Sequence, residues 1–181
     1  ISSWGQKPAK GQATTFLNFS NCTNFGARLT LSAPTTGCSS GATGAISGIG
    51  GLVASAAQNH IDTGGLGAAE GSRTGLRGNE IHQIFIQAVD DINVPMSQPD
   101  HADYDPLRYP SKEGWDMYFG YGRSNARKAV DIILDAEIPP IADIWEPRWF
   151  DLRSPKSGTI DITGQIAAPR DTVASWALDY A

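Results

Sequence analysis

The chain has 181 residues, of which 40% are hydrophobic and 18% are charged, a composition that supports a packed core and excludes a disordered chain. The 19 acidic and 14 basic residues give a net charge of -5, and Lys and Arg are scattered along the sequence. We therefore expect no nucleic-acid partner. Because the chain starts at Ile1 and no signal-peptide pattern opens it, we expect a fragment or a processed product.

The N-terminal third is predicted to contain a loop and two short strands. Residues 1–12 are rich in Gly, Lys, Ser and Pro and are expected to form the loop. Strands are predicted at Phe16 to Phe19 and at Ala27 to Ala33, where the second shows period-2 alternation and is stopped by Pro34.

A helix is predicted from Ser40 to about Gln58, because apolar residues recur there every three or four positions. Residues 29–61 contain no Asp, Glu, Lys or Arg, but Pro, Ser and Thr interrupt this stretch too often for a membrane span. Each internal Gly costs a helix about 1 kcal/mol relative to Ala. The glycines therefore predict a central helix with no solvent face, closely approached by other backbone.

The middle of the chain is predicted to hold two more helices. After a polar connection at Gly64 to Gly78, which is expected to loop out, Asn79 is a suitable N-cap. The apolar face of the helix that follows has the residues Ile81, Ile84, Phe85, Ala88 and Ile92, and the helix is expected to end near Asn93 to Pro95. An irregular Pro-rich segment at 96–113 and a Gly120-Tyr-Gly122 turn lead to the last helix. This helix is predicted at Ser124 to Leu134, with Ala126, Ala129, Val130 and Ile133 inward.

A boundary is predicted at Ile138-Pro139-Pro140, where the hydrophobic period changes from 3.6 to 2 residues. Strands are expected at Gly158 to Ala167 and at Val173 to Tyr180. The sequence thus predicts an α/β domain over residues 1–137, and a linker with the start of a β-sandwich-like domain, of immunoglobulin or jelly-roll type, over residues 138–181.

Two cysteines, Cys22 and Cys38, are too few for a disulfide scaffold and lack metal-ligand spacing. They form either one bridge, which implies an oxidising compartment, or two buried thiols.

The segment from Ala33-Pro34 through Gly37-Cys-Ser-Ser40-Gly-Ala-Thr-Gly44 resembles the nucleophile region of subtilisin-like serine peptidases (subtilases). There, a strand ending in Ala-Pro precedes a Gly-Thr-Ser-x-Ala motif, whose Ser heads a buried helix of small residues. Asn24-Phe-Gly26, the helix at Glu80 and Phe119-Gly-Tyr-Gly-Arg-Ser-Asn-Ala126 extend the resemblance over roughly residues 16 to 136. It implies a partial subtilisin-like three-layer fold, with a parallel sheet and helices.

The resemblance implies that Ser40 is a catalytic nucleophile in peptide-bond hydrolysis, that peptides or proteins are the substrates and that the protein is secreted. A serine at a helix N-terminus also gains free N–H groups and the positive end of the helix dipole for an oxyanion. The alternative is that Ser40 only caps the helix. Cys38 and Ser39 replace the usual Gly-Thr, Gly41 a bulkier residue and Gly44 the usual Pro, so the substrate pocket is expected to differ.

The catalytic acid and base of subtilases precede the nucleophile, but residues 1–39 contain neither His nor Asp. We therefore expect the triad Asp and His upstream of this chain, and no catalytic role for His60, His82 or His101, which all follow Ser40. The chain alone is expected to be nearly inert. The rival hypothesis is a non-catalytic binding protein, acting through the 64–78 loop or the β-module.

No cofactor is expected. Calcium stabilises many subtilases, and the acidic loop Asp100 to Asp105 offers oxygen ligands for it, although the pattern is not an EF-hand and a solvated loop is the alternative. Four aromatic residues near the boundary are interpreted as packing between domains, with sugar stacking as the alternative: Trp145, Trp149, Phe150 and Trp176. Arg123 and Asn125 are expected to fix the last turn.

Overall fold

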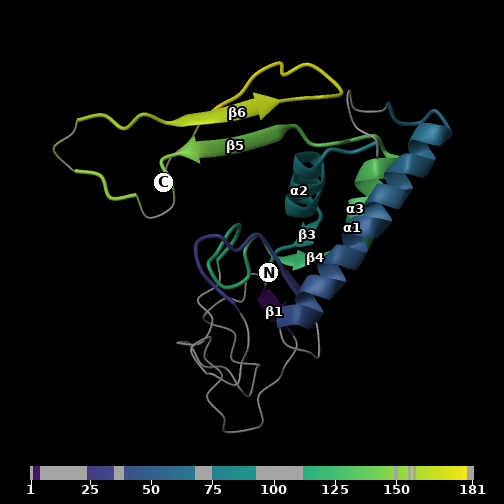
Figure 1. The fold of residues 1–181 in the computed structure, drawn as a ribbon, viewed down its shortest axis with the longest axis horizontal. Helices are drawn as coiled ribbons and strands as arrows, with labels where there is room; N and C mark the ends of the chain where they lie inside the picture. Colours follow the sequence, from purple (N-terminus) through teal and green to yellow (C-terminus); the bar gives the residue numbers. More distant parts are fainter. Residues whose placement is uncertain are drawn as a thin grey trace, which may run out of the picture.

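The computed structural model describes residues 2–4, 24–34, 39–67, 75–92, 112–148, 151–154, 156 and 158–178. In this part of the chain it shows a mixed α/β structure with three helices and two small sheets (Figure 1). Several predictions concern residues outside these ranges: the strand at 16–19, both cysteines, His101, the acidic loop, Trp149 and Phe150.

The first sheet has the strand order β1-β2-β4-β3. β1 (Ser2–Trp4), β2 (Ser32–Pro34) and β4 (Arg123–Ser124) run parallel, and β3 (Val89–Asp90) pairs antiparallel with β4. β1 corrects the loop prediction at residues 2–4. β2 takes only the last two residues of the strand predicted at 27–33 and continues to Pro34, because these residues pair with the distant strands β1 and β4. Leu29, Leu31 and Ala33 are buried as the predicted alternation requires, but Ser32 between them is also fully buried, so the alternation does not hold in β2.

Helix α1 (Ser39–Asp62) confirms the helix predicted from Ser40 and extends four residues further. One side of α1 packs into the core, but the prediction of a helix with no solvent face is wrong here. Leu52 is 49% exposed, and a Cβ added at Gly44, Gly48 or Gly51 would meet no atom within 4 Å. Among the helix glycines at positions 44, 48, 50 and 51, only Gly50 faces a close neighbour, the ring of Phe85.

Helix α2 (Gly78–Gln87) begins one residue before the predicted cap, because Arg77 occupies the N-cap position and its N–H donates to the Glu80 carboxylate at 2.7 Å. It ends before Ile92, since Val89 and Asp90 leave the helix to form β3. Helix α3 (Ala126–Leu134) lies within the predicted range, with Asn125 as its N-cap.

The core forms where the three helices meet. Its buried side chains come from α1, α2, α3 and both ends of the connection between α1 and α2: Val53, Ala57, Leu66, Leu76, Ile84, Ala88, Ala129 and Ile133. The prediction that residues 64–78 loop out is therefore wrong at the ends of the segment, where Leu66 and Leu76 anchor it. A second group, formed by Leu31, Ala33, Ala42 and Ile46, packs β2 against the first turns of α1.

The second sheet is an antiparallel pair of β5 (Ile141–Glu146) and β6 (Thr163–Ala167), which lies over α2 in Figure 1. Only the end of the strand predicted at 158–167 forms, and β5 was not predicted. The described part of the strand predicted at 173–180, residues 173–178, has no strand partner and is not a strand. Trp145 and Trp176 are more than half exposed, so they do not pack between domains as expected.

Among the described helices, none has the combined length and apolar character that a membrane crossing needs.

Candidate functional site

Ser40 lies in the first turn of α1 and is exposed. The helix begins at Ser39, so Ser40 is inside the turn and its N–H belongs to the first four, which have no partner within the helix. The first turn contains no acidic residue. The positive electrostatic potential at the N-terminal end of α1 is therefore not reduced by a carboxylate in that turn.

The packing of β2 against α1 fixes where Ser40 lies. Ala33 in β2 and Ala42 in α1 are both fully buried, and Ile46, one turn further along the helix, is 7% exposed. Because Ala42 is two residues from Ser40, this contact holds the first turn of α1 at the end of the sheet. The small side chains on both sides allow the close approach.

Ser32 anchors β2 to the neighbouring segment. Its side chain is fully buried, its N–H donates to Gly122 O at 2.9 Å and its Oγ donates to the same oxygen at 3.2 Å. One carbonyl therefore receives two hydrogen bonds from the strand that leads to Ser40. The position of Gly122 fixes that strand.

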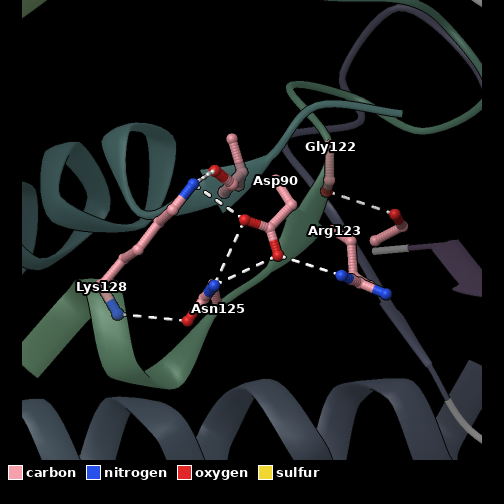
Figure 2. Close-up of polar contacts among 7 residues, drawn as sticks. Asp90, Gly122, Arg123, Asn125 and Lys128 are labelled. Atoms are coloured by element: carbon pink, nitrogen blue, oxygen red, sulfur yellow. Dashed lines mark hydrogen bonds and ion pairs between the residues drawn. The ribbon is translucent and has the colours of Figure 1, made fainter. Parts of the chain in front are cut away.

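A charged cluster connects the far edge of the sheet with α3 (Figure 2). The Asp90 carboxylate contacts Lys128 Nζ at 2.8 Å, Arg123 Nη2 at 3.0 Å and Asn125 Nδ2 at 3.1 and 3.2 Å. Asn125 Oδ1 in turn accepts the Lys128 N–H at 3.1 Å and caps α3. Hydrogen bonds from Lys128, Arg123 and Asn125 lower the pKa of Asp90 to about 2.

This cluster clarifies the roles of Arg123 and Asn125. Both side chains donate hydrogen bonds to Asp90. These bonds hold the turn before α3, in agreement with the prediction that Arg123 and Asn125 fix this turn. Asp90 itself was not singled out in the sequence, because it lies at the end of a predicted helix. Asn125 follows Asp90 by 35 residues, so no local sequence pattern indicates that the two side chains are in contact.

Asp116 is a second acidic residue that sequence reasoning did not select. It is 4% exposed, and its Oδ1 accepts the N–H groups of Tyr118 and Phe119, both at 2.8 Å. Its Oδ2 is buried with no hydrogen-bond partner among the described residues. Burial raises the pKa of Asp116, against the opposing effect of the amides. These contacts close the turn that leads to Gly120.

The described histidines are not placed as a base for Ser40. His60 is in the last turn of α1, twenty residues further along the helix, which corresponds to about 30 Å at 1.5 Å per residue. His82 is exposed on α2. Across the described ranges, no group of three or more His, Cys, Asp or Glu side chains is arranged to hold a metal ion.

A surface hollow of about 620 Å³, open to solvent, lies in the C-terminal segment, and Ser40 is not among its lining residues. Its lining mixes charged, polar and apolar side chains: Glu146, Leu152, Arg153, Thr159, Ile160 and Asp161 contribute to it. Glu146 and Arg153 also form an ion pair at 3.7 Å.

Comparisons of the chain with protein-family models, with curated proteins and with solved structures found no match.

Proposed function

We propose that this chain carries the nucleophile of a serine peptidase of the subtilisin-like type, with Ser40 attacking peptide bonds of peptide or protein substrates. The observation that carries the proposal is the position of Ser40. It is an exposed serine in the first turn of a long helix, held by Ala42 against β2, a strand that pairs in parallel with both of its neighbours. The Ala-Pro to Ser motif lies at this junction.

In the proposed reaction, Ser40 Oγ attacks the substrate carbonyl carbon and its proton passes to a histidine. The carbonyl oxygen becomes an oxyanion, for which the Ser40 N–H is a donor, and the N-terminal end of the α1 dipole favours the negative charge. The tetrahedral intermediate then expels the amine, which takes the proton, and water releases the acyl group. No metal or cofactor takes part in these steps.

The histidine and its orienting aspartate are proposed to belong to polypeptide outside these residues. The exposed face of α1 supports this proposal, because it has space at Gly44, Gly48 and Gly51 and no charged residue before Asp62. A solvated helix face ordinarily carries charged side chains. The polypeptide with the base would cover this face and reach Ser40.

The finer fold assignment is part of the same proposal. The parallel strands β1, β2 and β4 with their helices are taken as part of a subtilisin-like three-layer domain, and the β5–β6 pair as the start of a β-sandwich-like unit after residue 138. Secretion is proposed on the family resemblance alone.

The test is labelling with a fluorophosphonate probe of the longest natural polypeptide that contains these residues, followed by peptide mapping. We expect the label on Ser40 and its loss in Ser40→Ala. Ser47→Ala is the matched control, because Ser47 is exposed on the same helix. Folded protein without label on Ser40 would contradict the proposal.

A binding protein is the second candidate function. The observation in its favour is the exposure of Trp145 (56%) and Trp176 (69%) in the C-terminal segment, since large aromatic side chains are frequent at interfaces. This function predicts peptide or protein binding that is weakened by Trp145→Ala and unchanged by Ser40→Ala.

A further inference from the structure

The contacts of Arg170 indicate that the C-terminal segment is fastened to helix α2. We propose that the ion pair between Glu80 and Arg170 is a clamp that holds the β5–β6 hairpin on α2. Release of the hairpin then requires a buried carboxylate to lose its partner. This inference does not depend on the function of Ser40.

The geometry of the pair is that of a specific contact. Arg170 Nε lies 2.8 Å from Glu80 Oε1, and Nη2 lies 3.4 Å from Oε2 and also donates to Gly75 O. The Glu80 side chain is fully buried and that of Arg170 is 12% exposed. The two residues are 90 positions apart, so the pair joins segments that are distant in sequence.

Glu80 cannot be satisfied by α2 alone. One of its oxygens accepts the Arg77 N–H and caps the helix, but this bond leaves the negative charge in a buried position. Removing one member of a buried ion pair is strongly destabilising, because the other charge stays uncompensated. Arg170 supplies the only positively charged partner of Glu80 among the described ion pairs.

The other attachment of the hairpin is at its first strand. Ile141 is 1% exposed, Pro139 is buried, and Gln83 Nε2 of α2 lies 3.4 Å from Ala142 O. The hairpin is therefore fixed to α2 at the start of β5 and again three residues after β6. Figure 1 shows the pair of strands extending beyond α2. Because Ile141 pairs with Ala167, both attachments lie at the same end of the antiparallel pair, and toward the other end Ile144 is exposed and adds little burial.

The remaining described ion pairs of the C-terminal segment are different. Arg153 pairs with Glu146 at 3.7 Å and with Asp151 at 3.3 Å, Arg148 pairs with Glu146 at 3.2 Å, and the four side chains are 34 to 71% exposed. These pairs lie within the segment and do not reach α2. Arg153→Ala is therefore a matched control, because it removes an arginine and its ion pairs without removing a contact to α2.

The test is hydrogen–deuterium exchange of the full chain with peptide resolution. We expect Arg170→Ala to increase exchange in residues 141–167 by roughly tenfold or more, while the buried part of α3 changes little. Arg153→Ala is expected to leave exchange at 141–146 unchanged. Equal exchange at 141–146 in both variants would overturn the clamp.

A second pair of variants keeps the inference testable if Arg170→Ala does not fold. Glu80→Gln retains an acceptor for the Arg77 N–H but removes the negative charge. Because the cost arises from the unpaired carboxylate, Glu80→Gln combined with Arg170→Met is expected to fold and to be more stable than Arg170→Met alone. If the double variant loses the sum of both single losses, the two residues are not coupled and the inference fails.

Discussion

Asp90 at the end of β3 and Asn125 at the start of α3 are joined by two hydrogen bonds of 3.1 and 3.2 Å from the same amide nitrogen. The other side-chain atom of Asn125, Oδ1, caps α3 through the Lys128 N–H. One side chain therefore binds both the sheet edge and the helix terminus. Because β4 follows β3 in the sheet and pairs with β2, this connection supports the strand that leads to Ser40.

We predict that Asp90 stabilises the protein only above its folded-state pKa. Three partners lower that pKa from 3.8 to about 2, so the folded form holds the proton less tightly than the unfolded chain. The contribution is complete above pH 4 and is lost as the pH falls toward 2. Since part of the side chain is exposed, we expect Asp90→Asn to cost about 1 kcal/mol at pH 7.

Urea unfolding between pH 2 and pH 7 measures this effect. The wild-type protein is expected to lose more stability than Asp90→Asn as the pH falls from 4 to 2. Asp131→Asn is the control, because Asp131 is in an exposed pair with Arg127 and its removal is expected to change little. Equal pH slopes in wild type and Asp90→Asn would refute the role of the cluster.

Substitutions of Asn125 separate two contributions to the stability of the protein, the capping of α3 and the hydrogen bonds to Asp90. Asn125→Ala removes both and is expected to cost about 1 to 2 kcal/mol. Asn125→Asp keeps an acceptor for the cap but places a second carboxylate beside Asp90, so its deficit is expected to be larger at pH 7 than at pH 3. Asn125→Ser keeps the cap without charge. Thermal unfolding of the three variants at pH 3 and at pH 7 tests these expected stability losses.

The helices could be predicted from the sequence because the hydrophobic pattern of a helix lies within a short stretch of the chain. The 3.6-residue period of Ile46, Ile49 and Val53 predicted α1, and that of Ala129 and Ile133 predicted α3. The strands β3 and β4 have only two residues each and exist because they pair with each other and with β2. No periodicity can indicate such pairing, so α2 was extended too far toward Ile92.

The candidate site shows the same division. The position of Ser40 in the first turn of α1 could be predicted from the contiguous sequence around it, and its catalytic role stays a prediction. The partners of Asp90 and Glu80 come from positions 35 and 90 residues away and could not be predicted. The glycines of α1 predicted a covered helix, yet Gly44 and Gly48 face open space. Composition indicates that a face is suited to burial, but it does not identify what covers it.

Asp116 is predicted to have the opposite pH dependence to Asp90. Burial raises its pKa, so the folded protein holds this proton more tightly than the unfolded chain. Its contribution is therefore present below pH 3.8 and declines as the pH rises through the folded-state pKa. Asp116→Asn retains an acceptor for the Tyr118 and Phe119 N–H groups without the charge, and is expected to be at least as stable as wild type at pH 7.

Asp116→Ala is the informative comparison for that prediction. It leaves both N–H groups without their acceptor and is expected to cost about 1 to 3 kcal/mol. Calorimetric unfolding at pH 4 and pH 7 distinguishes the variants. If Asp116→Asn were as unstable as Asp116→Ala at pH 7, the carboxylate charge would be required in the folded state and the assigned pKa direction would be wrong.

Gly120 and Gly114 provide a matched test of how the turn at 112–122 is held against the segment that leads into β2. Both have positive φ angles, +66° and +80°, so an alanine at either position is strained by about 1 kcal/mol. A Cβ at Gly114 would meet no neighbour within 4 Å, whereas one at Gly120 would overlap the backbone of Thr30 and Leu31. Tyr121 N–H also donates to Thr30 O at 2.8 Å, so the two segments cannot separate without losing this bond.

We expect Gly120→Ala to lower the free energy of unfolding, measured with urea, by at least about 2 kcal/mol more than Gly114→Ala does. Equal losses would mean that the turn moves away from Thr30 at no cost, and that the contact does not fix β2.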